Sequence, residues 1–422
     1  MICQLLSFFS FQESLQIIHC RKAPPIDTQD RIARFDSGYA IEHAHNDWLE
    51  FAAEGGVGFA LLWAVLAAVG LIGIWQRLTQ GHLPAGYGSY APWGLWIAIY
   101  FHGVGIAGGV FAIGALGHLL DWPGFTSRRV LRSIIILSFA AFTPAFLGVW
   151  LDLGHPERAA AIMLRPNFGS MMAFNAWMYN AFMAVAGLIL LLSYRQDNGW
   201  LKPLLVLAGL LSLMFPSQSG AFFGVVETKP FWNSALLPML FLTGALTSGS
   251  ALLLVVRRLM GDDGAGIDRL RVIVGLGLAA YTVFEFAEFS IALWNPHVHA
   301  PEIELILWGP YWWVFWIVHL ACGMVLPGLL LITGSRRCWW WGALLVAICF
   351  ISSRLNVLIP GQATGDLLGL QGAFQHPRLS FIYHATAMEY LVGLFLVALG
   401  MGVFWIGQRI DSVLAAKAGT NA

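Results

Sequence analysis

Several ionisable and amide side chains occur inside long hydrophobic stretches of the sequence, where water is excluded. Glu285 and Glu288 are three residues apart, which places both carboxylates on one face of a helix. An ionisable group in a membrane interior costs about 2.5–3.5 kcal/mol or more, so such groups are candidates for proton transfer or ligand binding. The further buried or nearly buried polar residues of this kind are His102, Gln218, Arg354, Asn356, His384 and Glu389.

The composition indicates a protein made mostly of membrane-spanning segments. Of 422 residues, 58% are hydrophobic and only 11% are charged, against roughly a quarter charged in soluble proteins. This low charge excludes a soluble enzyme, a disordered regulator and a disulfide scaffold. The 23 Lys and Arg residues balance 23 Asp and Glu residues, so nothing indicates a nucleic-acid partner. The expected surrounding is the lipid bilayer.

Ten hydrophobic stretches are long enough to cross a bilayer, which takes about 20 apolar residues each. Their hydrophobicity does not alternate with a period of two, so helices are expected and barrel strands are not. Gly105 and Gly109 form a G-x-x-x-G pattern that lets helices pack closely. We predict an all-α, polytopic transmembrane helical bundle with one N-terminal span and about nine core spans. The spans lie at about 51–76, 92–120, 131–151, 171–194, 201–226, 235–256, 270–293, 308–333, 338–359 and 382–407.

Lys and Arg are distributed unevenly between the connections. One set of connections carries most of them, including Arg128, Arg257 and Arg336, and the positive-inside rule makes this set cytoplasmic. The prediction is a multi-pass protein of the inner (plasma) membrane with a cytoplasmic C-terminus. Most of the buried polar residues then fall toward the outer ends of their spans, which predicts one polar pocket beneath the outer face. The longer connections that face outward are 152–170, 294–307 and 360–381.

Cysteine and histidine spacing argues against a metal centre within this chain. The five cysteines form no C-x-x-C pair, which excludes c-type haem attachment and cysteine-ligated iron–sulfur clusters. His297 and His299 lie close to Glu302 and Glu304, but an H-x-H pattern in a loop is a weak metal signal, and we predict no metal site. Electron transfer would therefore depend on metal centres of a partner or on a diffusible organic carrier.

The first 50 residues are more polar than the rest and end in the motif H-A-H-N-D-W-L-E at 43–50. The region of about 35–76 resembles the O-antigen ligase/polymerase family, in which an H-x-H-N-D-x-L-E motif precedes a hydrophobic span. That resemblance implies glycan transfer through His45 and an outward-facing loop, whereas ten spans place the N-terminus inside. We expect residues 1–85 to be a separate segment, a fusion or a gene-model artefact, followed by a membrane domain at 86–412 and a cytoplasmic tail at 413–422.

A series of short motifs lies between the hydrophobic spans of the core region. They are P-W-G-L-W-I-A at 92–98, L-D-L-G-H-P-E-R at 151–158, L-R-P-N at 164–167, S-M-M at 170–172, K-P-F-W-N-S at 229–234, R-L-N-V-L-I-P-G at 354–361 and M-E-Y at 388–390. Each is a weak pattern alone. In this order, over about residues 90–410, they resemble the NrfD/polysulfide reductase (PsrC-like) membrane-subunit family.

The resemblance implies a helical subunit that carries no haem or iron–sulfur cluster of its own. Such a subunit exchanges electrons between the membrane quinone pool, menaquinone or ubiquinone, and a partner iron–sulfur subunit, which usually serves a molybdopterin catalytic subunit. Where the family often has a Tyr in P-S-Y-T-G, this chain has Gln218 in P-S-Q-S-G. Gln218 keeps a hydrogen-bond donor but lacks the phenol.

The residues named above match what a quinol site requires. Oxidation of quinol releases two protons with two electrons, so an ionisable group must accept protons, and polar groups must bind the two oxygens. We assign the proton-transferring, catalytic role to Glu285, Glu288 and Glu389. The residues assigned to binding the quinone are His102, Gln218, Arg354, Asn356 and His384. The residues assigned to partner docking on the outer face are Asp152, His155, Arg158, Arg165, Trp232 and Asn233.

Other interpretations remain open. A b-type cytochrome would need two axial histidines on facing helices, for which His102, His319 and His384 are available. An O-antigen-type glycosyl transferase would depend on His45, and a transporter would need paired broken helices in two repeats, which the sequence lacks. Structural roles also compete, because Arg354 could neutralise Glu389 or Glu288 as an ion pair, and Asp152 could pair with Arg158.

Overall fold

The computed structural model describes residues 47–165, 167–195, 199–262, 264–294, 296–365, 373, 376 and 379–418, with side chains omitted for 47–57 and 296–300. Every regular element in these ranges is a helix, and ten helical segments are long and apolar enough to cross a membrane. The prediction of an all-α polytopic bundle with ten spans is therefore confirmed. His45 lies outside the described residues, as do the side chains of His297 and His299.

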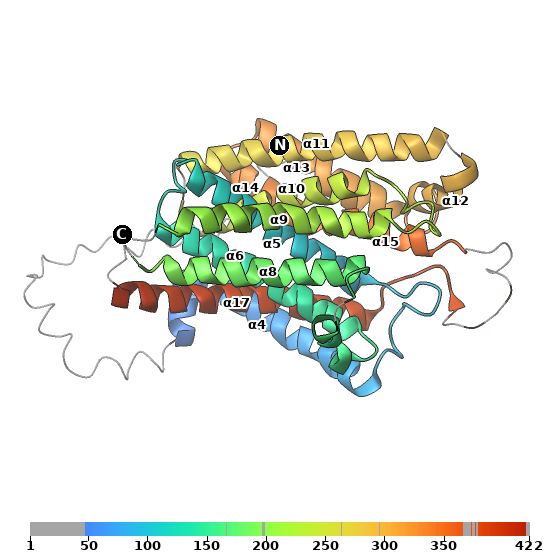
Figure 1. Cartoon of the computed structure of the whole chain (residues 1–422), viewed down its shortest axis with the longest axis horizontal. Helices are drawn as coiled ribbons and strands as arrows, with labels where there is room; N and C mark the ends of the chain where they lie inside the picture. The colour runs from blue at the N-terminus through green and yellow to red at the C-terminus, as the bar shows by residue number, and fades with distance from the viewer. Residues whose placement is uncertain are drawn as a thin grey trace, which may run out of the picture. The chain divides into compact units, whose positions relative to one another are not determined.

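The spanning elements follow one another along the chain (Figure 1). In chain order they are α4 (Asp47–Gln80), α5 (Leu95–Leu119), α6 (Arg128–Asp152), α8 (Met171–Leu192), α9 (Leu201–Gly224), α10 (Leu237–Leu259), α11 (Ala265–Trp294), η4 (Val314–Val325) with α13 (Leu326–Thr333), α14 (Arg336–Cys349) with α15 (Ile351–Gln362), and α17 (Ala387–Ala418). The short elements η3 (Pro156–Arg158), α7 (Ala161–Leu164) and α12 (Pro296–Leu307) lie in connections.

The chain divides into two compact units, Met1–Leu66 and Ala67–Ala422. The second unit contains the last turns of α4 and all later helices, and α5 is its most buried span. Close helix packing depends on glycine, because a Cβ on Gly109 would lie 2.0 Å from the carbonyl oxygen of Ala245, and one on Gly249 would lie 2.5 Å from the amide of Val110. The G-x-x-x-G pattern thus brings α5 against α10 without side chains between them.

Two spans of this unit are irregular near their middle. The eighth span begins as a π-helix, η4, and a turn at Phe350 separates α14 from α15 within the ninth. π-helical turns are rare in proteins, and those that occur are often part of a functional site. The two irregular segments meet, since His319 of η4 lies 3.0 Å from Ser352 at the start of α15.

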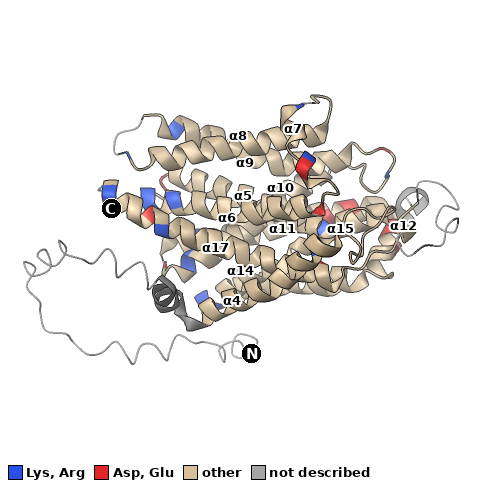
Figure 2. Cartoon of the chain, turned by 90° about the horizontal axis from the view of Figure 1, so that it is seen from below, with Lys and Arg blue, Asp and Glu red and all other residues tan. Residues whose placement is uncertain are grey.

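Charged residues are concentrated at the two ends of the bundle (Figure 2). Most Lys and Arg lie at the end where α17 terminates, whereas Asp and Glu are more frequent at the opposite end. This distribution matches the asymmetry on which the orientation was predicted. We refer below to the end that contains the N-terminus of α5, the C-terminus of α15 and α12 as the outer end.

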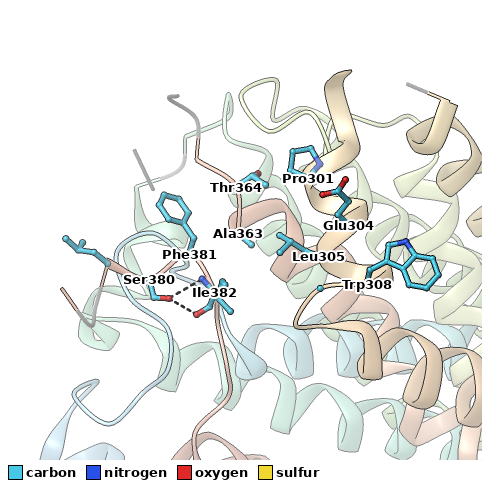
Figure 3. A pocket seen from close by; sticks show the side chains of 11 residues that line it. Pro301, Glu304, Leu305, Trp308, Ala363, Thr364, Ser380, Phe381 and Ile382 are labelled. Atoms are coloured by element: carbon cyan, nitrogen blue, oxygen red, sulfur yellow. Dashed lines mark hydrogen bonds between the residues drawn. The ribbon is translucent and has the colours of Figure 1, made fainter. Parts of the chain in front are cut away.

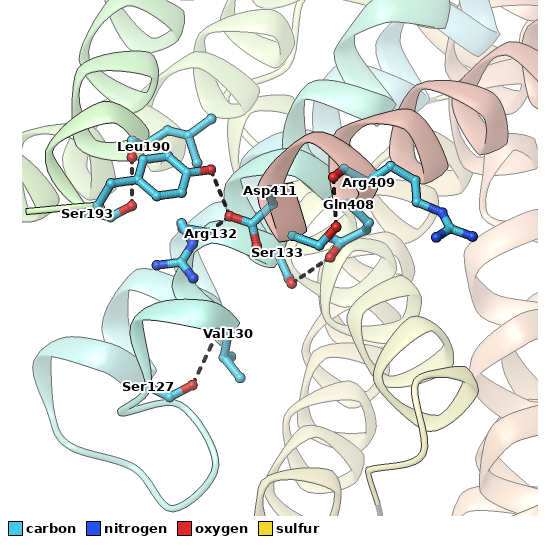
Figure 4. A network of polar contacts seen from close by, with 11 residues as sticks. Ser127, Val130, Arg132, Ser133, Leu190, Ser193, Gln408, Arg409 and Asp411 are labelled. Atoms are coloured by element: carbon cyan, nitrogen blue, oxygen red, sulfur yellow. Dashed lines mark hydrogen bonds and ion pairs between the residues drawn. The ribbon is translucent and has the colours of Figure 1, made fainter. Parts of the chain in front are cut away.

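A buried ion pair holds α6 and α17 together at the cation-rich end (Figure 4). Nε of Arg132 lies 2.5 Å from Oδ1 of Asp411, and both side chains are at most 5% exposed. The hydroxyl of Tyr194 donates to the same oxygen at 2.7 Å, and the guanidinium lies over the Tyr194 ring. Ser133 donates to Gln408 beside this pair. These contacts fix the C-terminal helix against the bundle core.

Replacing Arg132 with Met should therefore lower the stability of the bundle by about 3–5 kcal/mol, because Asp411 stays buried without its cation. The measurement is the thermal unfolding midpoint of the detergent-solubilised protein. Arg336→Met is the matched control, since Arg336 pairs with Asp268 at an exposed site and such pairs contribute at most about 1 kcal/mol. Equal losses in the two variants would contradict the role of the Arg132–Asp411 pair.

Candidate functional site

A second buried polar contact of the spanning helices is centred on His319. Its side chain is fully buried, with Nε2 lying 2.8 Å from Oε1 of Glu285 on α11. Nδ1 lies 3.0 Å from the hydroxyl of Ser352 on α15. Three helices thus place an imidazole, a carboxylate and a hydroxyl in direct contact. The contact with Ser352 is a hydrogen bond, whereas the contact with Glu285 is within ion-pair distance but lacks hydrogen-bond geometry. An imidazole and a carboxylate in this arrangement are each able to bind a proton.

Aromatic rings surround the His319 side chain of this cluster. The rings of Tyr281, Phe315 and Phe350 lie 5.8–6.0 Å from the His319 ring. Tyr281 precedes Glu285 by one helical turn, so the phenol and the carboxylate share a face of α11. The surroundings strengthen every electrostatic interaction among the polar groups, because the local dielectric is low.

Arg354 forms the second part of the site, two residues after Ser352 on α15. Its guanidinium is 3% exposed, donates to the carbonyl oxygen of Phe241 at 3.0 Å and lies 4.0 Å from the centre of the Phe241 ring. Nε has no hydrogen-bond partner among the described residues. Gly244 makes room for the guanidinium, since a Cβ there would lie 3.0 Å from Nη2. A buried cation with a free donor is suited to a ligand oxygen.

His102 approaches the same region from α5. Its Nε2 lies 2.8 Å from the carbonyl oxygen of Ala347 on α14, and the Arg354 charge is near enough to act on the imidazole. Glu288, one turn beyond Glu285, accepts a hydrogen bond of 2.7 Å from Ser234 in the connection before α10. Of the predicted residues, Glu285 contacts His319 directly and Arg354 lies two residues after Ser352. His102 and Glu288 have their hydrogen-bond partners outside this cluster, at Ala347 and Ser234.

Glu389 has a different environment. Its side chain is fully buried and accepts hydrogen bonds from the Tyr383 hydroxyl at 2.5 Å, from the Gly86 amide at 2.9 Å and from the amide and hydroxyl of Thr386. Thr386 and Glu389 form the T-x-x-E spacing of a capping box at the start of α17. Burial, and then the charge of Glu389, raise the pKa of Tyr383 above its usual range, so the phenol remains a donor.

Two of the other predicted quinone ligands, Gln218 and His384, contact residues outside the cluster. Gln218 on α9 contacts the sulfur of Met171 on α8 at 3.2 Å, on the α8 side of the bundle. His384 is exposed in the segment before α17, with its ring 6.3 Å from that of Tyr311. Asn356 is buried, and its Nδ2 has no partner among the described residues.

The predicted docking residues occupy three environments. His155, Arg158 and Arg165 are exposed in the connection between α6 and α8, as is Asn233 before α10. Trp232 is 5% exposed, donates to the carbonyl oxygen of Val357 and stacks on Trp93. Its side chain is therefore packed inside the bundle and is not on the surface available for docking. Arg158 lies 3.8 Å from Glu157, which corrects the expected pair with Asp152. Likewise, the contacts of Arg354 are with Phe241 and not with Glu389 or Glu288.

Asp152 borders a cavity of about 550 Å³ at the outer end of α6. Its Oδ1 is buried and has no partner among the described residues. Arg77 of α4 caps the end of α6 by donating to the carbonyl oxygens of Leu151 and Leu153. His82 links Arg77 to Tyr87, which also lines the cavity. The last residues of α4 thus form part of the outer end of the second unit.

Sequence reasoning did not place His319 together with Glu285 and Ser352 and considered it only as a haem ligand. The available signal was the position of His319 in the middle of a hydrophobic span. Ser352 and Tyr281 gave no signal, because Ser and Tyr are common in membrane helices. A second buried chain of hydroxyls, Tyr100 to Tyr179 to Ser219, was missed for the same reason.

Comparison with known proteins identifies the family. The polysulphide reductase NrfD family matches residues 85–365, which is more than half of the chain. The protein therefore belongs to the NrfD family, and the resemblance of the core motifs is confirmed.

Its relatives are subunits of several oxidoreductases. It is 27% identical over 396 residues to a subunit of the selenate reductase of Mesobacillus selenatarsenatis, covering 82% of this chain and 92% of that protein. It is 23% identical over 378 residues to the Hdr-like menaquinol oxidoreductase integral membrane subunit of Archaeoglobus fulgidus, with coverages of 85% and 94%. It is also 23% identical over 303 residues to the menaquinone reductase integral membrane subunit of Nitratidesulfovibrio vulgaris, with coverages of 64% and 71%.

Proposed function

We propose that this protein is the integral membrane subunit of a quinone-linked oxidoreductase, exchanging electrons between the quinone pool and an extrinsic iron–sulfur subunit. The observation that carries the proposal is the cluster of Glu285, His319, Ser352 and Arg354 inside the membrane-spanning helices of an NrfD-family protein. Buried ionisable groups are costly in a membrane and are retained where they act on ligands or protons.

The names of two relatives support a quinone as the substrate. The relatives from Archaeoglobus fulgidus and Nitratidesulfovibrio vulgaris are membrane subunits of a menaquinol oxidoreductase and a menaquinone reductase. The chemical fit is consistent, because a quinone offers two acceptor oxygens and a quinol two donors. The unpartnered Nε of Arg354 provides a donor, and Glu285 provides an acceptor. We extend this to menaquinone or ubiquinone here, with a molybdopterin protein as the expected catalytic partner.

The residues of the cluster have separable tasks in such a reaction. Oxidation of the quinol releases two electrons to the partner's metal centres and two protons to the membrane subunit. Glu285 is placed to accept a proton, which His319 then shares across the 2.8 Å contact. Glu288, bonded to Ser234, lies one turn nearer the outer end and offers the next carboxylate on the way to water. Arg354, whose guanidinium contacts Phe241, offers its unpartnered Nε to a quinone oxygen.

The orientation follows from the distribution of charge. We assign the cation-rich end of the bundle to the cytoplasm, which places the C-terminus inside and the outer end on the other side of the inner membrane. The exposed residues His155, Arg158, Arg165 and Asn233, together with Asp152, then lie on the face that meets the partner.

Two substitutions test the assignment of the site. We expect His102→Ala and Glu288→Gln to lower quinol-dependent turnover of the assembled complex about tenfold or more, without loss of assembly. The measurement is the steady-state rate with a short-chain quinol in membranes that contain equal amounts of complex. Wild-type rates in both variants would remove these residues from the site, and normal rates in every variant of the cluster would contradict the proposed function.

A further inference from the structure

A second cavity, of about 750 Å³, opens at the outer end beside α12 (Figure 3). Leu305 of α12 and Trp308, which follows the end of α12, form one apolar wall, and Phe381 and Ile382 form another. The second wall is held in shape, because Ser380 exchanges two hydrogen bonds with the backbone of Ile382, and the amide of Tyr383 donates to the Tyr311 hydroxyl at 2.9 Å. The cavity is therefore a formed feature of the fold.

Carboxylates give this apolar cavity a negative side. Glu304 lines the cavity and is exposed. Glu302 is 4% exposed and lies behind the lining residue Thr364, whose hydroxyl donates to its Oε1 at 2.7 Å. The Oε2 of Glu302 is buried and has no hydrogen-bond partner among the described residues. A buried carboxylate oxygen without a hydrogen-bond donor is unfavourable, and a positive group nearby would stabilise it.

The cavity lies at the outer end of the bundle, beside the start of the eighth span. Trp312, Trp313 and Trp316 are partly exposed where the eighth span begins, as expected of an aromatic belt at the membrane surface. α12 precedes this belt, beyond the end of α11 (Figure 1). The group that enters the cavity must therefore come from a water-soluble molecule or domain at the outer face.

We propose that this cavity receives an Arg or Lys side chain of the extrinsic subunit, and this inference rests on the proposed function. The aliphatic stem would lie against Leu305 and Phe381, the cationic head would meet Glu304, and Trp308 offers a ring face for a cation. The apolar walls exclude water from the ion pair, so the contact is stronger than a surface pair. Docking at this point brings the extrinsic subunit over the outer ends of α11 and α15. Glu288 lies on α11 and Arg354 lies on α15.

The test uses the complete complex, purified from native membranes through a tag on this chain, and exposed to increasing salt. Glu304→Lys is expected to release the iron-containing extrinsic subunits at a several-fold lower salt concentration than the wild type, and Glu304→Gln at an intermediate one. Glu227→Lys is the matched control, because Glu227 is equally an exposed carboxylate at the outer end but lies outside the cavity. Release of all variants at the wild-type salt concentration would overturn the inference.

A photoreactive phenylalanine analogue at position 308 provides a direct readout. We expect a cross-link to a peptide of an iron-containing subunit in which the attached segment carries an Arg or Lys. Cross-links to lipid only, or to this chain only, would contradict the inference. If no iron-containing subunit is present in the wild-type preparation, the proposed function fails. A different outcome would contradict the docking inference alone. In that outcome the subunit is present and quinol oxidation is normal, but the Glu304 variants release the subunit at the wild-type salt concentration and position 308 gives no cross-link to it.

Discussion

Glu285→Gln is expected to lower quinol-linked turnover about a hundredfold while the complex remains assembled. General acid–base groups contribute typically about 10²–10⁴-fold, and the amide is unable to take up a proton. The amide keeps the size of the carboxylate, so the contact with His319 is preserved in shape while its charge is lost. His319→Gln should have a comparable effect, because it removes the second proton-binding group of the same contact. The measurement is the rate of quinol oxidation at equal amounts of assembled complex.

The matched control for this pair is Glu227→Gln, an exposed carboxylate beyond the end of α9. It makes the same change of charge at the same end of the bundle and should leave the rate unaltered. The double variant with Glu285→Gln and His319→Gln should be little slower than either single variant, since both residues serve one proton path. A rate within about twofold of wild type in Glu285→Gln would show that the cluster does not take part in turnover.

Glu389→Ala is expected to reduce the amount of folded protein severely, with a destabilisation of about 3–5 kcal/mol. The substitution leaves the Tyr383 hydroxyl and the Gly86 amide without their acceptor, and each unsatisfied buried group costs about 1–3 kcal/mol. It also removes the carboxylate from the capping box with Thr386 at the start of α17. The measurements are the yield of monodisperse protein in detergent and its thermal unfolding midpoint.

This variant separates a structural role from the catalytic role predicted for Glu389. Glu157→Ala serves as the control, because the same side chain is removed at an exposed position and stability should be unchanged. A structural role predicts that any residual Glu389→Ala complex has a nearly normal rate per assembled complex. Normal yield and stability together with a strongly reduced rate would instead support the catalytic role.

The spans were predictable because they depend on length and hydrophobicity alone. Ten apolar stretches in the sequence correspond to the ten spanning helical segments. The irregular segments were not predictable in this way. The sequence around His319 is as apolar as that of its neighbours, and the π-helix over Val314–Val325 depends on packing against α14 and α15. The same holds for the turn at Phe350, which no proline or glycine in the adjacent sequence announces.

The site was predictable only where neighbours in sequence are also neighbours in space. The i, i+3 spacing of Glu285 and Glu288 placed them on one face of α11, which follows from helix geometry. The partners of Arg354 and His102 come from α10 and α14 and required the tertiary fold. Glu389 was predicted to be a membrane-buried acid with a catalytic role. In the structure it is buried because it caps the N-terminus of α17 together with Thr386. The T-x-x-E pattern at 386–389, followed by an apolar run, is the sequence signal of such a cap.

Electron exchange with quinol is measured directly by rapid mixing of the purified complex in lipid nanodiscs with a menaquinol analogue under anaerobic conditions. We expect quinol oxidation, followed by its ultraviolet absorbance, to keep pace with reduction of the partner's iron–sulfur centres, and Glu285→Gln to slow both together. Centres that are reduced by dithionite but do not exchange electrons with quinol or quinone at any measurable rate would contradict the proposed function.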